Sequence, residues 1–124
     1  MTGSSNYLLD TNIVLYLLNG DEVLARILDR KTPYISFITE MELLCFQKLT
    51  VTEENKVKAF LAQCHIIEMN AAIKTMAINI KRTSGLKIPD SIIAATGEYL
   101  DISVLTADAE FNKLKSLNIL QYKK

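Results

Sequence analysis

Four acidic residues occupy similar places in the sequence, each beside a short apolar segment or at the start of a helical pattern: Asp10, Glu42, Asp90 and Asp108. Carboxylates that cluster raise one another's pKa values unless a cation neutralises them. Mg²⁺ or Mn²⁺ would do so with oxygen ligands and retained waters. A bound ion of this kind lowers the pKa of a ligand water and screens the charge of a phosphoryl transition state. Together the four acids would suit metal-dependent hydrolysis of phosphodiester bonds.

Each acid also has a simpler interpretation at a helix terminus. Asp10 and Asp90 fit the N-cap position, where a side-chain oxygen accepts from a free backbone N–H. Thr39 and Glu42 fit a capping box, T-x-x-E. Asp108 would be favoured in a first helical turn by the helix dipole. For any acid taken singly, both interpretations stay open.

Redundant capping residues favour the ligand interpretation at two of the four positions. Thr11 or Asn12 could cap the helix that follows Asp10, and Thr106 could cap the helix that holds Asp108. The two carboxylates are then not needed as caps. We therefore expect both to be free for a ligand.

The placement of Glu42 favours the same interpretation. On a helix predicted over 38–49, at about 100° per residue, Glu42 falls in the middle of an apolar group made of Met41, Cys45, Phe46 and Leu49. A carboxylate on a buried apolar face must be paired or hold a cation. Glu42 is therefore predicted to be a ligand.

Alternating short apolar runs and helical patterns indicate the elements that would position these acids. Strands are predicted at 7–9, 33–36, 65–68, 103–105 and 118–121. Helices are predicted near 12–18, 21–30, 38–49, 53–63, 70–84, 90–100 and 108–115. Strands separated by helices favour a parallel sheet covered on both faces. In such sheets, sites form beyond the carboxyl ends of the strands, where Asp10 and Asp108 are expected.

Composition limits the other kinds of site. Lys plus Arg and Asp plus Glu each total 14, so net charge gives no reason to expect nucleic-acid binding. Cys45 and Cys64 are too few and too far apart for a disulfide framework or a CxxC metal site. The single His65 cannot build a zinc site, which leaves a hard cation with oxygen ligands. No apolar run approaches the ~18 residues of a membrane span, and we expect a cytoplasmic protein.

Four segments carry a family resemblance: "LLDTNIVLYLL", "ISFITEMELL", "IPDSIIAAT" and "VLTADAEF". Together, and in this order, they resemble the PIN-domain ribonucleases, specifically the VapC-type toxins of bacterial type II toxin–antitoxin systems. The resemblance implies an α/β fold, a three-layer α/β/α PIN-like domain with a central parallel sheet of four to five strands. A single such domain would span residues 7–124, after a flexible lead-in or expression remnant at 1–6.

The resemblance also implies an activity and a set of site residues. It implies a Mg²⁺- or Mn²⁺-dependent endoribonuclease, with Asp10, Glu42, Asp90 and Asp108 as both catalytic and metal-binding residues. Site support would come from Thr11, Asn12 and Thr106. The sequence departs from the family pattern at Glu110, where Asp is common, and near Ala107, where Arg is frequent. Both departures concern substrate contacts rather than the acids.

The partners implied by the resemblance are an RNA substrate, such as a tRNA or ribosomal RNA, a cognate antitoxin protein and a second copy in a homodimer. The antitoxin's C-terminal segment would lie over the active site. No membrane partner is expected. The apolar helices near 38–63 are a candidate for the dimer interface.

Basic residues near the acids are candidates for contacts with RNA phosphates. They are Lys81, Arg82, Lys87 and Lys113, with Lys115 close by; each of them also fits a solvated helix end or loop.

Two other functions are weighed against the nuclease. One is a catalytically silent PIN scaffold that binds RNA or protein. The other is a receiver-like phosphoacceptor domain. Such a domain would need a pair of acids near the first strand and a lysine after the fifth, and this sequence has neither pattern.

Overall fold

The computed structural model describes residues 6–124. Residues 1–5, which make up most of the lead-in predicted at 1–6, lie outside the described residues. Strands and helices follow one another in the order β1 (Asn6–Leu9), α1 (Thr11–Leu18), α2 (Glu22–Ile27), β2 (Thr32–Ser36), α3 (Phe37–Leu44), α4 (Val51–Gln63), β3 (His65–Ile67), α5 (Ala71–Ser84), α6 (Ile88–Leu100), β4 (Ser103–Thr106), η2 (Ala109–Lys113) and β5 (Ile119–Gln121).

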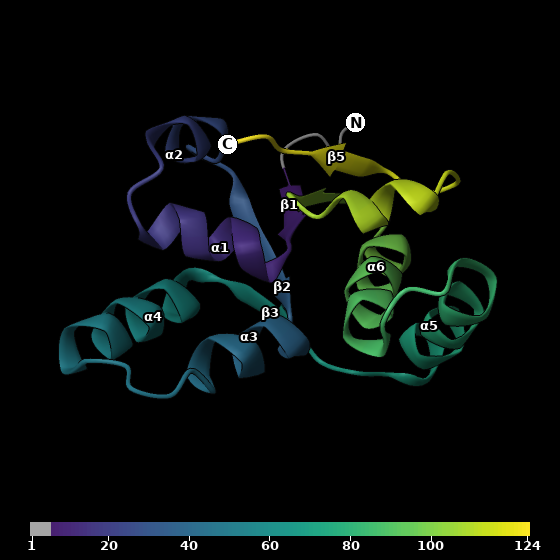
Figure 1. The fold of residues 1–124 in the computed structure, drawn as a ribbon, viewed down its shortest axis with the longest axis horizontal. Coiled ribbons are helices and arrows are strands. Elements are labelled where there is room, and N and C mark those ends of the chain that lie inside the picture. The colour runs from purple at the N-terminus through teal and green to yellow at the C-terminus, as the bar shows by residue number, and fades with distance from the viewer. Residues whose placement is uncertain (1–5) are drawn as a thin grey trace.

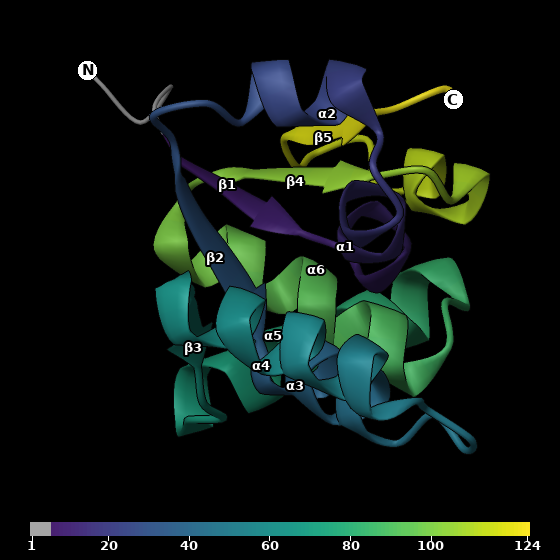
Figure 2. The same cartoon turned by 90° about the vertical axis from the view of Figure 1, so that its left-hand side faces the viewer.

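The five strands form one sheet in the order β3-β2-β1-β4-β5. Every neighbouring pair is parallel, and β1 lies in the centre, with Leu8 opposite Tyr34 of β2 and Val104 of β4. The predicted parallel sheet is therefore confirmed. In Figure 2 the arrowheads of β1 and β4 point to the same side of the molecule, so the residues that follow these strands begin side by side.

The strands alternate between two apolar cores, one on each face of the sheet. Leu8 packs with residues of α5 and α6, whereas its neighbour Leu9 packs with residues of α1 to α4. The same alternation places Val104 in the first core and Leu105 in the second. Figure 1 shows the sheet between these two groups of helices. The predicted three-layer α/β/α architecture is thus present, because both faces of each central strand are apolar.

The capping box considered for Thr39 and Glu42 does not form. Ser36 caps α3, its side chain accepting from the backbone N–H of Ile38 at 3.0 Å. Thr39 is instead fully buried inside the helix. A capping box does form at the next helix, where Thr50 and Glu53 satisfy each other's backbone N–H.

Three predicted helices are shorter than their patterns indicate. The one predicted at 38–49 ends at Leu44, and Lys48 has a positive φ of 66° in the connection that follows. The one predicted at 108–115 is a single 3₁₀ segment, Ala109–Lys113, and the one at 21–30 is reduced to Glu22–Ile27. Among the residues that the structure describes, no helix is long and apolar enough to cross a membrane.

Candidate active site

All four predicted acids line one open pocket of about 500 Å³. We call it the acidic pocket; it is lined by Asp10, Thr11, Asn12, Leu15, Glu42, Cys45, Phe46, Asp90 and Asp108. Asp10 directly follows β1 and Asp108 lies two residues beyond β4, at the carboxyl edge of the sheet. Glu42 belongs to α3 and Asp90 to the first turn of α6. Residues from four separate parts of the chain therefore meet here.

Asp10 is held by hydrogen bonds to both of its carboxylate oxygens. Oδ1 accepts from the backbone N–H of Thr11 at 2.8 Å, and Oδ2 accepts from the hydroxyl of Thr106 at 2.7 Å. Asp10 also caps α1, so the expectation that Thr11 or Asn12 would cap this helix is wrong. The cap and pocket positions are compatible, because a carboxylate can accept several hydrogen bonds.

Burial dominates the electrostatics of Asp10. Its side chain is only 5% exposed, and desolvation of the charged form raises the pKa of this carboxyl. The hydrogen bonds from Thr106 and Thr11 oppose that rise, while the charges of Asp108 and Glu42 add to it. A cation in the acidic pocket would relieve the repulsion.

Asp90 is not the N-cap of its helix. Lys87 occupies the cap position of α6 without a side-chain cap bond, and Asp90 lies in the first turn after Pro89. Burial, followed by the negative charges of Asp10, Asp108 and Glu42, raises the pKa of Asp90 to about 6, against a partial lowering by Lys87. The part of this shift that comes from the three other acids indicates that their charges act on Asp90 across the pocket.

Glu42 reaches the acidic pocket for a different reason from the one that the sequence suggested. The apolar group predicted around Glu42 is not buried, since Met41 is 54% exposed and Phe46, which lies beyond the end of α3, is 44% exposed. Glu42 is itself exposed, and its Oε1 accepts a hydrogen bond from the hydroxyl of Thr11. The prediction that burial forces this carboxylate to be paired is therefore wrong, although the residue does line the pocket.

Thr106 joins the two acids that follow the central strands. Its hydroxyl donates to Asp10 and accepts from the backbone N–H of Asp108 at 3.0 Å. Asp108, and not Thr106, caps the short η2 segment, since Asp108 Oδ1 accepts from the N–H of Glu110 at 2.9 Å. Asn12 lines the pocket with an exposed side chain.

Sequence reasoning missed Thr39 as part of this network. Its hydroxyl oxygen lies 3.0 Å from that of Thr11, although the two residues are 28 positions apart. The only sequence signal was a polar residue three positions before Glu42 on the same helix. That signal was assigned to a capping box instead.

The donor set of the acidic pocket fits a hard divalent cation. The four acids supply oxygen ligands only, and two of them have raised pKa values that a cation would lower again. Within residues 6–124, no group of three or more acidic, histidine or cysteine side chains lies close enough together to hold a metal ion directly. Mg²⁺ does not require such a group, because it keeps several waters and is commonly held by one or two carboxylates.

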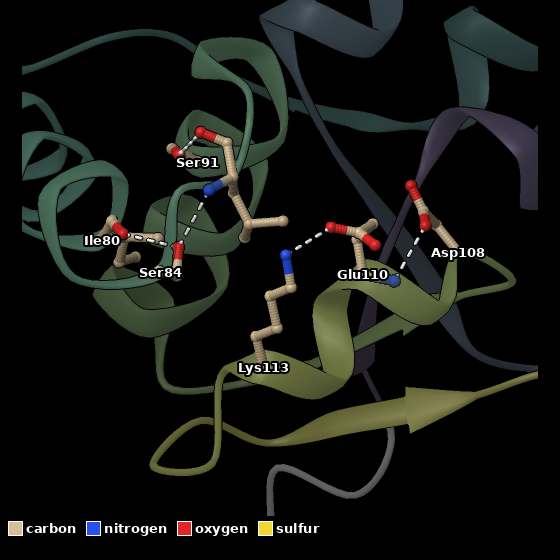
Figure 3. A network of polar contacts seen from close by, with 7 residues as sticks. Ile80, Ser84, Ser91, Asp108, Glu110 and Lys113 are labelled. Atoms are coloured by element: carbon tan, nitrogen blue, oxygen red, sulfur yellow. Dashed lines mark hydrogen bonds and ion pairs between the residues drawn. The ribbon is translucent and has the colours of Figure 1, made fainter.

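The basic residues predicted to contact RNA lie in different surroundings. Lys81 and Arg82 line a separate, apolar pocket between α5 and α6. Lys113 forms an ion pair of 2.7 Å with Glu110, which Figure 3 shows beside Asp108. Lys87 is exposed at the start of α6, and its charge lowers the pKa values of both Asp90 and Glu110. Among these four residues, Lys87 alone combines two features. Its charge acts on Asp90, an acid of the pocket, and it forms no ion pair with any of the described residues.

Known structures share this arrangement of elements. The chain is similar to a toxin–antitoxin complex from Klebsiella pneumoniae, with a TM-score of 0.82 and 25% identity over 95% of this chain and 99% of that one. It is also similar to VapBC-1 from nontypeable Haemophilus influenzae, with a TM-score of 0.79 and 22% identity over 96% and 99% of the two chains. A third similar structure is VapBC2 from Rickettsia felis bound to a promoter DNA fragment, with a TM-score of 0.76 and 22% identity over 95% of this chain and 99% of that one.

Sequence comparison agrees with the structural one. No curated protein matches the chain significantly. The family model described as the PIN domain, however, matches residues 7–117, which include every acid of the pocket. The match therefore covers most of the chain, from the central strand β1 to the segment before β5. The chain belongs to the PIN domain family.

Proposed function

We propose that this protein is a Mg²⁺- or Mn²⁺-dependent endoribonuclease that acts as the toxin of a toxin–antitoxin pair. PIN domains are generally nucleases, which supports hydrolysis of a phosphodiester bond. The observation that carries the proposal is the meeting of Asp10, Glu42, Asp90 and Asp108 in one open pocket. Open access matters because an RNA backbone must reach the carboxylates.

Together the four carboxylates would hold the cation, one or two of them directly and the others through its retained waters. Asp10 is the most firmly oriented, through its bonds to Thr11 and Thr106. Asp90 and Asp108 would complete the negative side of the site. When bound, the divalent ion would supply an activated water and screen the charge that develops on the phosphate.

RNA binding would depend on local rather than overall charge. The whole chain has a net charge of zero, and the pocket itself is acidic. Lys87 is exposed at the start of α6, three residues before Asp90, so its ammonium group would be available to a phosphate beside the pocket. Lys81, Arg82 and Lys113 would contact RNA farther from the reacting phosphate.

A cognate antitoxin is the protein partner that we propose. The similar structures from Klebsiella pneumoniae, Haemophilus influenzae and Rickettsia felis are described as toxin–antitoxin or VapBC assemblies. A homodimer is proposed with it. Growth arrest on expression, relieved by a co-expressed antitoxin, is expected; normal growth with soluble protein present would contradict the toxin role.

The second candidate is a silent PIN scaffold that binds RNA or protein without cleavage. It is compatible with the same fold, because a fold does not determine activity. The presence of all four acids in one pocket favours the enzyme. Membership of the PIN family excludes the receiver-like alternative.

Cleavage of total RNA by purified protein separates these two candidates. The wild type is expected to cleave in Mg²⁺ and not in EDTA, and Asp10→Asn is expected to lose the activity in Mg²⁺. Asp29→Asn serves as a matched control, because Asp29 is an exposed acid outside the acidic pocket. Cleavage that persists in EDTA or in Asp10→Asn would contradict the proposed mechanism.

A further inference from the structure

The hydroxyl of Thr39 has an unusual partner for a threonine inside a helix. Thr39 is fully buried in α3, and buried hydroxyls form hydrogen bonds. The common solution is a bond to the carbonyl four residues earlier. Buried Thr96 of α6 adopts it, donating to Ile92 O at 2.7 Å. Thr39 instead lies 3.0 Å from the hydroxyl of Thr11, at the start of α1.

The direction of the hydrogen bonds follows from the donors available. Thr11 has one hydroxyl proton, and its contact with Glu42 requires that proton because an ionised carboxylate only accepts. In the contact between the two threonines, Thr39 must therefore donate and Thr11 accept. The result is a one-way relay from Thr39 through Thr11 to Glu42. Bonds in such a chain polarise and strengthen one another.

Glu42 needs this help more than Asp10 does. It is exposed on α3, and a long, exposed side chain loses rotamer entropy when it is held in one orientation. Its carboxylate has one hydrogen-bond partner among the described residues, Thr11. Asp10, by contrast, is buried and has two.

We propose that Thr39 is a positioning residue that aims the Glu42 carboxylate into the acidic pocket through the hydroxyl of Thr11. The inference rests on the proposed function, since it assigns a metal-site role to the carboxylate that is aimed. Thr39 itself does not line the pocket, so its role would be indirect. Its contribution is the donated hydrogen that leaves the proton of Thr11 for Glu42.

The test compares two substitutions at the same position. Thr39→Val keeps the shape but removes the donor, and Thr39→Ser keeps the donor. Partners that orient metal-binding side chains typically contribute about 10- to 100-fold to metal affinity or activity. Thr39→Val is therefore expected to weaken Mn²⁺ binding about 10-fold and to lower kcat more than it raises KM. Thr39→Ser is expected to stay close to wild type.

Thr96→Val is the matched control, because it makes the same change in another buried helical threonine away from the pocket. It is expected to leave Mn²⁺ affinity unchanged. Unchanged Mn²⁺ affinity in Thr39→Val, or an equal loss in Thr39→Ser, would overturn the relay. If Thr39→Val does not fold, Thr39→Cys replaces it, since a thiol is only a weak donor.

A metal-free measurement separates the relay from the proposed function. In EDTA, the urea midpoints of Thr39→Val, Glu42→Ala and the double variant are expected to be non-additive, because each change breaks the same relay. Additive midpoints would overturn the relay. If the midpoints of the variants are non-additive but the wild-type protein binds no Mn²⁺, the relay is supported and the metal-dependent function is contradicted.

Discussion

The hydroxyl of Thr106 donates a 2.7 Å hydrogen bond to Asp10 across a separation of 96 positions in the sequence. The bond is buried and joins the ends of the two adjacent strands β1 and β4. It also connects Asp10 to Asp108, whose backbone N–H donates to the same hydroxyl. Two acids of the pocket are therefore placed relative to each other by one side chain.

Thr106→Val is expected to raise the pKa of Asp10 further. The Thr106 hydrogen bond opposes the effect of burial, so its loss leaves desolvation less compensated. Because a cation binds the ionised carboxylate, the acidic limb of the cleavage pH profile is expected to move to higher pH. The measurement is the pH dependence of RNA cleavage at fixed Mg²⁺.

Thr106→Ser is the control for this prediction, because it keeps the hydroxyl. Thr106→Val also leaves the N–H of Asp108 without its acceptor, at a cost of about 1–3 kcal/mol if that group stays buried. Superimposable pH profiles for wild type and Thr106→Val would show that this bond does not tune Asp10.

The metal-free protein is expected to lose stability as the pH rises through about 6, the raised pKa of Asp90. A folded-state pKa above the unfolded value of 3.8 means that the native state binds more protons between these values. The contribution of Asp90 is therefore fully present at low pH and lost as Asp90 ionises. Asp10 acts in the same direction. Asp90→Asn should remove the Asp90 part of this loss.

Urea unfolding at several pH values gives the free energy of unfolding of the wild type and of Asp90→Asn, and the difference between the two measures this effect. The stability advantage of Asp90→Asn is expected to grow between pH 4 and pH 7 in EDTA, and to shrink when Mg²⁺ is added to the wild type. A difference that is constant with pH would mean that Asp90 titrates normally.

Lys87→Gln is expected to weaken RNA binding more than Lys113→Gln does. Lys113 is already paired with Glu110, whereas Lys87 acts on the Asp90 side of the pocket. Loss of one phosphate contact reduces the slope of log K against log salt by about 0.7 for a single strand. The measurement is the affinity of both variants for the same RNA at several salt concentrations. Equal slopes for Lys87→Gln and wild type would show that Lys87 does not contact an RNA phosphate.

Gly97→Ala is expected to destabilise the protein despite alanine's higher helix propensity. A Cβ at position 97 would lie 2.4 Å from Cγ2 of Val104, where α6 packs on β4. The propensity gain is about 1 kcal/mol, and overpacking a core costs about 1–3 kcal/mol. Thermal unfolding measures the balance. Val104→Ala should partly rescue Gly97→Ala by removing the clashing methyl group, and the absence of rescue would show that another contact is responsible.

Local sequence patterns predicted the parallel sheet and the four acids, but they could not predict hydrogen bonds between residues far apart in the sequence. Leu8 and Leu9 lie in opposite cores, and the continuous apolar run of β1 indicated a strand buried on both faces. The length of α3 was mispredicted because the apolar spacing continues through Phe46 and Leu49, whereas the helix ends at Leu44. The role of Thr39 was missed because its partner lies 28 positions away.

The same limit explains the caps. Asp10 both caps α1 and lines the pocket, so treating cap and ligand as alternatives was mistaken. Ser36, the cap of α3, also ends β2, and the helix predicted from residue 38 begins at Phe37, whereas the sequence pattern suggests Thr39 as its cap. Caps depend on where the chain turns, which the residue pattern places only within a few positions.

We propose that the four carboxylates of the acidic pocket act together in Mg²⁺-dependent RNA cleavage. The most direct measurement is the single-turnover cleavage rate of one RNA by Asp10→Asn, Glu42→Gln, Asp90→Asn and Asp108→Asn, each compared with the neighbouring control Glu40→Gln. Each of the four is expected to lose at least about 100-fold, as removal of a metal-binding or catalytic carboxylate does, while Glu40→Gln retains wild-type activity. Wild-type rates in any two of the four variants would contradict the account.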